Sequence, residues 1–260
     1  MARSTYYYQQ QVAEQGDTDL ALKKRIQSVF DKHQGRYGYR RVALEIRSKG
    51  QLVNHKRVQR LMGELHLKSL VRPKKYRSYK GEVGEAADNL LERNFEATAM
   101  NEKWVTDVTE FNVGGKKLYL SPVMDLCNGE IIAFETNTRP VLSLVTNMLR
   151  KALRKLGRDD KPILHSDQGW HYRKLAYRKA LKDKNVVQSM SRKGNCLDNS
   201  AMESFFAVLK TEYFYLQKFA SIEELKKGLA KYIRYYNHER IKMRLNGLSP
   251  VQYRTQLQPA

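Results

Sequence analysis

The chain has few cysteines and no long apolar segment. Its two cysteines, Cys127 and Cys196, cannot supply a disulfide framework or the thiolate ligands of a zinc site. No apolar run approaches the ~20 residues that a membrane-spanning helix needs. The opening MARSTYYYQQQ lacks the apolar stretch that secretory signal peptides carry. We therefore expect a soluble, cytosolic protein with no membrane partner.

Acidic residues are also scarce relative to basic ones. The chain contains 48 Lys and Arg against 27 Asp and Glu, which gives a net charge of +21. Residues 20–80 hold 18 of the basic residues and three acidic ones, so +15 of this charge lies in one short segment. Such a concentration is typical of a module that binds nucleic-acid phosphates. The alternative is a basic surface that serves only solubility.

The basic segment is predicted to fold as a small all-α domain over residues 20–67. Apolar residues recur in it at the spacing of three helices: Leu22, Ile26, Val29 and Phe30; Val42 and Ile46; Val58, Leu61, Met62 and Leu65. A short turn between the second and third helices fits a helix-turn-helix, whose last helix would enter the DNA major groove. Asn54 is a suitable N-cap for that helix. Its outward residues Lys56, Arg57 and Arg60 are the candidate DNA-binding residues, although a small bundle with a solvated basic face is the alternative.

Two segments around this domain lack regular periodicity. Residues 1–19 are predicted as a polar tail, and residues 68–100 as a linker. In the linker the basic, tyrosine-rich RPKKYRSYK is followed by the small and acidic GEVGEAAD. Its tyrosines could stack on bases, or the segment could be a plain flexible tether.

From residue 101 the pattern changes to mixed α and β structure. Strands are predicted over 103–113, 116–126, 130–136, 163–165 and 186–187, and helices over 142–156 and 173–183. Three strands followed by alternating helices and strands match an α/β RNase H-like fold with a mixed five-stranded sheet, here over residues 101–215.

A C-terminal helical extension is predicted over residues 216–260. Ser221 and Glu224 form a capping box at the start of its helix. The apolar stripe of the helix is formed by Leu225, Leu229, Ile233 and Tyr236, and the basic residues that follow are His238, Arg240, Lys242 and Arg244.

Three carboxylates stand out in the α/β part. Asp107 lies in the strand-like KWVTDVTEFNV, Asp167 follows the short strand of PILHSDQG, and Glu203 lies in the helical NSAMESFFAVLKTE. They are 60 and 36 residues apart, so only the fold can gather them. Together they would form an all-oxygen site that suits Mg²⁺ or Mn²⁺, and such sites hold two cations during phosphoryl transfer. Three acids alone are weak evidence, because most acidic residues are solvated surface groups.

The words around these acids are more specific. WVTDVTEF (104–111), HSDQG (165–169), QSMSRKGNCLDNSAMESFFAVLKTE (188–212) and YYNHERIKMRLNGLSPVQYR (235–254) occur in this order. The chain thereby closely resembles the OrfB-type DDE transposases of the bacterial "insertion sequence three" family, which are relatives of retroviral integrases. The resemblance runs from about residue 3 to residue 254, nearly the whole chain.

This resemblance implies the chemistry of the three acids. Asp107, Asp167 and Glu203 would be the catalytic DDE triad and the ligands of two Mg²⁺ or Mn²⁺ ions, with the 35 intervening residues that the family shows between the last two. The activity would be cleavage of DNA strands and transfer of their 3′ ends. Lys210, two helical turns beyond Glu203, would hold the DNA backbone, unless it is simply an exposed helix lysine.

The resemblance also implies partners. These are double-stranded DNA, as transposon ends and as target, and further copies of the chain assembled on DNA. An upstream reading frame would add its own helix-turn-helix and leucine zipper as a partner or fused segment, because this chain contains no heptad run. The protein would act at the nucleoid in the bacterial cytoplasm.

Two other functions compete with the transposase. A DNA-binding regulator would use the basic helices and keep the acids only as relics, but the intact triad with its flanking words argues against it. An RNase H-like nuclease would hydrolyse DNA without joining it. The C-terminal YYNHER and LSPVQYR words argue against a plain nuclease.

Overall fold

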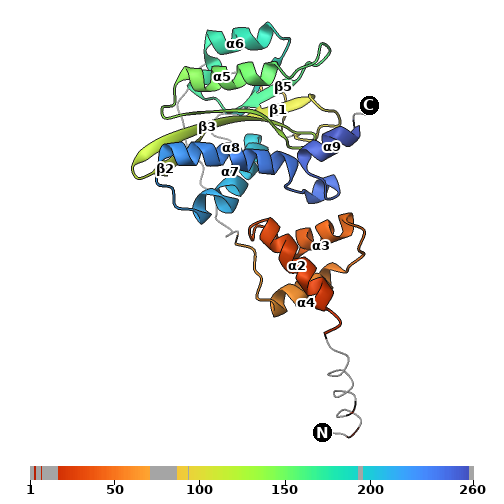
Figure 1. Cartoon of the computed structure of the whole chain (residues 1–260). Helices are drawn as coiled ribbons and strands as arrows, with labels where there is room; N and C mark the ends of the chain where they lie inside the picture. Colours follow the sequence, from red (N-terminus) through yellow and green to blue (C-terminus); the bar gives the residue numbers. More distant parts are fainter. Residues whose placement is uncertain are drawn as a thin grey trace. The chain divides into compact units, whose positions relative to one another are not determined.

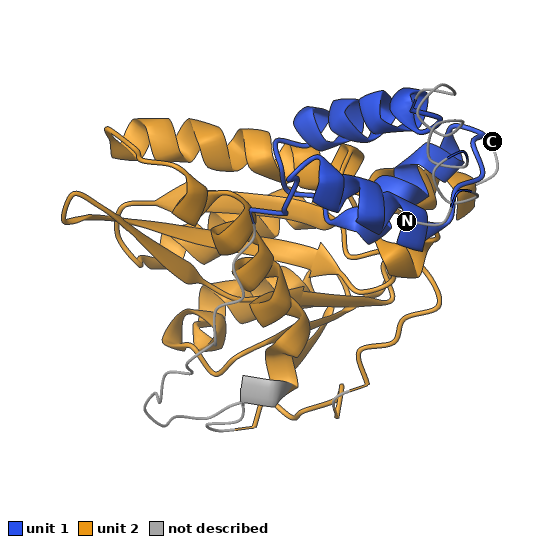
Figure 2. Cartoon of the chain, turned by 90° about the horizontal axis from the view of Figure 1, so that it is seen from below, with its two compact units in different colours: residues 1–71 blue, residues 72–260 orange. Residues whose placement is uncertain are grey.

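The computed structural model describes residues 17–70, 87–92, 94–192 and 196–257, together with Arg3 and Tyr7. The chain divides into two compact units, residues 1–71 and residues 72–260, which Figure 2 colours separately. The RPKKYRSYK and GEVGEAAD words of the predicted linker fall almost entirely outside the described residues, as does most of the predicted tail. The finer division of the chain into five segments stays a prediction.

The first unit contains the three predicted helices. They are α2 (Leu20–Lys32), α3 (Tyr39–Ser48) and α4 (His55–Glu64). Each helix contributes fully buried apolar residues to the core of this unit: Ile26, Val42, Ile46, Val58 and Leu61. The Asn54 side chain accepts a hydrogen bond from the Lys56 amide at 2.8 Å, which confirms the predicted N-cap of α4.

The second unit is built on one mixed sheet. Its strands are β1 (Lys103–Thr106), β2 (Thr109–Val113), β3 (Lys116–Asp125), β4 (Ile131–Asn137), β5 (Ile163–Ser166) and β6 (Val187–Met190). The order is β2-β3-β1-β5-β6, with β4 paired to β3. β1 pairs antiparallel with β3 and parallel with β5, and β5 pairs parallel with β6. The sheet has six strands where the sequence predicted five, because the strand expected over 103–113 is interrupted and counts as β1 and β2.

Helices cover both faces of this sheet (Figure 1). α5 (Leu142–Leu153) and α6 (Leu175–Lys182) pack on one face, around Trp104, Val145 and Leu164. α7 (Ser200–Glu212) and α8 (Ile222–His238) pack on the other, and α9 (Pro250–Leu257) follows α8. Short 3₁₀ turns connect these elements at Trp170–Arg173, Cys196–Asn199, Phe214–Leu216 and Met243–Leu245. The three-layer arrangement is the predicted RNase H-like architecture.

The helix α8 begins and packs as its sequence predicts. The Ser221 hydroxyl accepts from the Glu224 amide at 3.1 Å, while the Glu224 carboxylate accepts from the Ala220 amide at 2.7 Å. The predicted apolar stripe is buried at Leu225, Leu229, Ile233 and Tyr236. Of the predicted basic residues, Arg240 is buried and pairs with Glu212, the half-buried Lys242 donates to the Gly129 carbonyl at 3.0 Å, and His238 and Arg244 are exposed.

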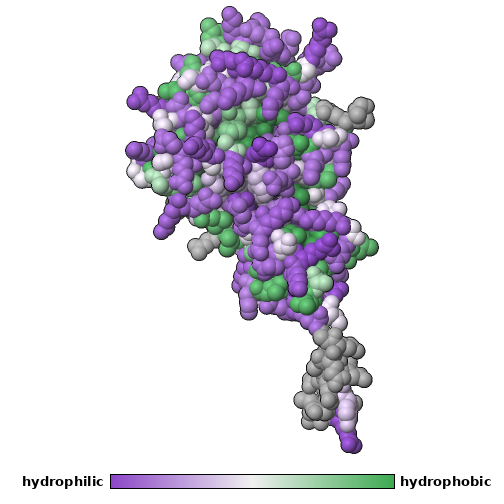
Figure 3. All heavy atoms as spheres, viewed as in Figure 1, coloured by the Kyte–Doolittle hydropathy of each residue, from purple (hydrophilic) through white to green (hydrophobic). Residues whose placement is uncertain are grey.

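The face of the molecule in Figure 3 is mainly polar. In Figure 3 hydrophilic side chains cover most of the viewed face, and hydrophobic ones gather only in small areas. Within the described ranges of the chain, no helix has the length and apolar character to cross a bilayer.

Candidate active site

Asp107 and Asp167 follow neighbouring parallel strands. The pairing of β1 with β5 sets Val105 opposite His165. Each aspartate comes two residues after its member of that pair, so continuing the register brings the two aspartates side by side just beyond the strand ends. The fold therefore gathers two acids that are 60 residues apart in the sequence.

The sheet is interrupted at Asp107, which is half-buried. β1 and β2 pair with β3 in one continuous register, in which Thr106 faces Val123 and Thr109 faces Leu120. Asp107 would then face Pro122, whose nitrogen carries no hydrogen for the ladder. The Thr106 hydroxyl donates to the Pro122 carbonyl at 2.8 Å instead. The interruption between β1 and β2 thus has a cause in the sequence, and it lies at the predicted catalytic aspartate.

Asp167 lies in a tight turn that needs a glycine. The Gly169 amide donates to Asp167 Oδ1 at 3.0 Å. A Cβ atom at Gly169 would lie 2.9 Å from that same oxygen, so any other residue would push the carboxylate aside. This contact explains the glycine of the HSDQG word.

Glu203 lies in the first turn of α7. The buried face of the helix, formed by Met202, Phe205, Phe206 and Leu209, packs against the sheet as the helical spacing predicts. The start of the helix is joined to β1, because Asn199 Nδ2 donates to the Thr106 carbonyl at 3.1 Å. The helix that carries Glu203 is therefore hydrogen-bonded to Thr106, the residue before Asp107.

The three carboxylates act on one another electrostatically. Removal from water raises the pKa of Asp107 well above its usual value, and the negative charges of Asp167 and Glu203 raise it further. The Val108 amide, which donates to Asp107 Oδ1 at 2.7 Å, and the charge of Lys210 oppose this shift. Loss of water also raises the pKa of Asp167, although that residue reaches the surface, and the charge of Arg173 opposes the shift.

The donor set fits hard divalent cations in its chemistry. All of its donors are carboxylate oxygens, and a cation among them would relieve the mutual repulsion that raises the pKa of Asp107. Nevertheless, in the described part of the chain no three His, Cys, Asp or Glu side chains are gathered tightly enough to hold a metal ion. The acids converge without closing into one coordination shell.

Lys210 lies beside the acids. Its ammonium stands 5.4 Å from the centre of the Phe111 ring on β2, and its charge reaches Asp107. The position agrees with the helical spacing, which puts Lys210 on the same side of α7 as Glu203.

Sequence reasoning missed three residues around this site. Arg173 acts on Asp167, and the fully buried Tyr172 is within electrostatic reach of Asp107 and Asp167. Asn199 is the N-cap residue of α7, but its side chain makes no capping hydrogen bond, and its Nδ2 donates to the Thr106 carbonyl instead. No local pattern indicates these roles, because Tyr172 and Asn199 act on residues at the end of the distant strand β1, and the effect of Arg173 on Asp167 depends on how the chain between them folds.

The candidate DNA-binding residues of α4 fall into two kinds. Lys56 is exposed. Arg57 and Arg60 both pair with the nearly buried Asp19 at the start of α2, with Arg57 Nε at 2.9 Å and Arg60 Nη2 at 2.6 Å. Arg60 also pairs with Glu64. The two arginines thus contribute to holding α4 against α2.

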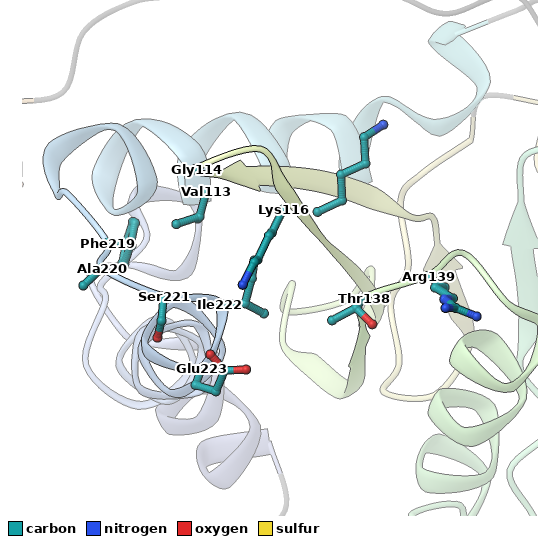
Figure 4. Close-up of a pocket in the computed structure, with 11 residues that line it drawn as sticks. Val113, Gly114, Lys116, Thr138, Arg139, Phe219, Ala220, Ser221, Ile222 and Glu223 are labelled. Carbon is teal, nitrogen blue, oxygen red and sulfur yellow. The ribbon is translucent and has the colours of Figure 1, made fainter.

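A separate hollow of about 450 Å³ lies at the far end of the β2–β3 hairpin (Figure 4). Lys116 extends in it toward the first turn of α8, and Thr138 and Arg139 line the side after β4. None of the predicted site residues lines it.

Comparison with known proteins gives matches over both units. Residues 97–196 and 203–257 each match a family model described as an integrase core domain, and residues 17–75 match an HTH-like domain. The chain is 54% identical over 254 residues to the InsK protein of insertion sequence element IS150 from Escherichia coli K12, covering 98% of this chain and 90% of InsK. It is 33% identical to the transposase InsF of insertion sequence IS3A from the same organism, covering 97% and 90% of the two chains.

A solved structure has a similar fold. A chain of the simian T-cell lymphotropic virus intasome, in complex with the PP2A regulatory subunit B56 gamma, superposes with a TM-score of 0.52 at 16% identity. The match covers 84% of this chain and 72% of that chain.

Proposed function

Because the chain belongs to the insertion sequence three family of bacterial DNA transposases, we propose that Asp107, Asp167 and Glu203 form its catalytic centre. At this centre the protein would cut a DNA strand and join the resulting 3′ end to a second duplex. The observation that carries the proposal is the parallel register of β1 and β5, which brings Asp107 and Asp167 side by side, and the raised pKa of Asp107, to which both other acids contribute, agrees with it. Such mutual repulsion among desolvated acids is typical of sites shaped for chemistry rather than for stability.

The proposed cofactor is a pair of Mg²⁺ or Mn²⁺ ions. Bound cations of this kind activate the attacking oxygen, stabilise the leaving oxygen and neutralise the charge that develops on the phosphate. Asp107 would serve both ions, because the charges of Asp167 and Glu203 both act on it. Asp167 and Glu203 would each complete the coordination of one.

Lys210 would hold the DNA beside the acids. Its ammonium can attract a phosphate of the strand being cut, while the Phe111 ring below it limits the positions it can adopt. This role concerns the placement of DNA and leaves the carboxylates unchanged.

The joining reaction tests the proposed function. We expect the chain, supplied with its upstream frame and Mg²⁺ or Mn²⁺, to join a labelled, pre-cut 3′ end to a second duplex. The Lys210→Ala variant should join at least ~10-fold more slowly because the DNA is placed less well. Lys226→Ala, which removes an exposed lysine from α8, should join like the wild type. A gel that resolves joined and hydrolysed strands measures both. Hydrolysis without joining, across several end sequences, would identify a nuclease instead.

The first unit would supply DNA binding through α4. The support is the charge of residues 20–71, which hold 13 basic and three acidic residues, together with the exposed Lys56. Because Arg57 and Arg60 pair with Asp19, their replacement would disturb the packing of α4 as well as any DNA contact. Lys56 is therefore the cleaner residue to change.

We expect Lys56→Glu to weaken binding to duplex DNA and to reduce the dependence of log affinity on log salt by about 1. Lys24→Glu is the matched control, since it makes the same charge change at an exposed position on α2. Fluorescence anisotropy with the full chain, in EDTA to prevent cleavage, measures both slopes. Equal losses in the two variants would favour the alternative of a basic surface without a specific DNA-binding helix.

The remaining partners are also proposals. Double-stranded transposon ends and target DNA would be bound by several copies of the chain, with an upstream-frame segment that adds end recognition. The protein would act on DNA in the bacterial cytoplasm.

A further inference from the structure

Asn199 joins the two elements that carry Asp107 and Glu203. It is the N-cap residue of α7 and lies four residues before Glu203. Its Nδ2 donates to the carbonyl of Thr106, the residue immediately before Asp107, at 3.1 Å. The bond is buried, and it spans 93 residues of sequence.

Both ends of this bond are themselves held in place. On the β1 side, the Thr106 hydroxyl donates to the Pro122 carbonyl at 2.8 Å. On the α7 side, the buried Asp198 carboxylate accepts from the Arg192 amide and from Asn89 Nδ2, each at 3.0 Å. The Asn199 amide therefore connects two fixed points and can transmit position between them.

A purely structural role explains Asn199 poorly. Its Oδ1 is buried and has no hydrogen-bond partner in the part of the chain that the structure describes. A buried acceptor left without a partner costs folding free energy, so the fold alone would be better served by a side chain without it. The amide is retained at a position where its donor reaches the strand that ends at the acidic site.

We propose that Asn199 is a positioning residue for the reaction, which sets the distance between the Asp107 and Glu203 carboxylates so that both can serve the same cations. This inference rests on the proposed function of the three acids. Asp107 lies between β1 and β2, where the pairing with β3 is interrupted, so regular strand pairing does not fix its position. The bond from Asn199 to Thr106 supplies the missing constraint from the helix that carries Glu203.

The test compares Asn199 with a second buried asparagine. Asn237 on α8 also binds a strand, with Oδ1 accepting from the Ile131 amide and Nδ2 donating to its carbonyl, both at 2.9 Å. We would make Asn199→Ala and Asn199→Leu, the latter filling the space without a donor, and the same two changes at Asn237. Mn²⁺ binding to the full chain without DNA is measured by electron paramagnetic resonance. The Mg²⁺ concentration for half-maximal cleavage is measured with DNA.

Both Asn199 variants should bind Mn²⁺ about 10-fold more weakly and need correspondingly more Mg²⁺, as for residues that support a metal ligand. Both Asn237 variants should lower the unfolding temperature at least as much, with unchanged Mn²⁺ affinity. Wild-type Mn²⁺ affinity in either folded Asn199 variant would overturn the inference. Failure of the wild type itself to bind Mn²⁺ or cleave DNA would instead count against the proposed function.

Discussion

Replacement of any one of the three acids should abolish strand cleavage while leaving DNA binding intact. For Asp107→Asn, Asp167→Asn and Glu203→Gln we expect cleavage in Mg²⁺ to fall by more than about 100-fold. The reason is that residues which merely support a metal ligand are already worth ~10–100-fold. DNA affinity should be unchanged, because we propose that it comes mainly from the basic segment of residues 20–80. Single-turnover cleavage of a labelled end and anisotropy on the same DNA measure the two properties.

The control for this prediction is Asp159→Asn, which removes an exposed carboxylate from the same unit. It should cleave like the wild type. Cleavage near the wild-type rate by any of the three acid variants would mean that the catalytic centre is misassigned.

The same substitutions should also show how much the three acids lower the stability of the folded protein. Loss of water and the charges of Asp167 and Glu203 raise the pKa of Asp107 in the folded protein, so at a pH above the pKa of the unfolded acid this group lowers the stability of the fold. We therefore expect the inactive Asp107→Asn variant to unfold at a higher temperature than the wild type in the absence of divalent cations. Such an exchange of stability for activity is common at functional sites.

Local patterns were sufficient to predict most of the helices. The apolar stripe of α8 and its Ser221 cap, like the Asn54 cap of α4, depend on residues within a few positions of each other. The alternation in 103–113 likewise predicted extended structure, and the words around the three acids pointed to the family.

The features that could not be predicted from the sequence depend on contacts between residues that are distant in the chain. The strand break at Asp107 follows from its register with Pro122, which can be read only after the hairpin is paired. The bonds from Arg57 and Arg60 to Asp19 and from Asn199 to Thr106 cross 38, 41 and 93 residues. Propensity carries no information about such pairs, so Arg60 was predicted only as a DNA-binding residue and the bond from Asn199 to β1 was not predicted.

A buried ion pair fixes the other end of α7. Glu212, the last residue of the helix, accepts from Arg240 Nε at 2.7 Å and Nη2 at 2.6 Å, and from the Tyr232 hydroxyl at 3.0 Å. The Arg240 and Glu212 side chains are only 5% and 3% exposed. Burial alone would lower the pKa of Arg240, but the hydrogen bonds and charge of Glu212 outweigh it and raise that pKa. The helix that carries Glu203 and Lys210 is therefore anchored by a residue of the YYNHER word.

Removing one partner of this pair should have the largest effect on stability. We expect Arg240→Met to destabilise the second unit by ~3–5 kcal/mol, because it leaves the Glu212 carboxylate buried without a counter-charge. Glu212→Gln combined with Arg240→Met should recover part of this loss, since no unpaired charge remains. Lys117→Met, which breaks the exposed pair with Glu110, should cost only ~0–1 kcal/mol.

Tryptophan fluorescence during urea unfolding measures these differences in the intact chain. The two tryptophans, Trp104 and Trp170, both lie in the second unit, so the signal is independent of the first. If Arg240→Met were no less stable than Lys117→Met, the buried pair would not anchor α7. If the double variant were more stable than Arg240→Met, the stability lost in Arg240→Met would come from the uncompensated charge rather than from packing. Any cleavage activity lost in Arg240→Met should then also return in the double variant. The reason is that the position of Glu203 depends on where α7 lies rather than on the charges at the end of the helix.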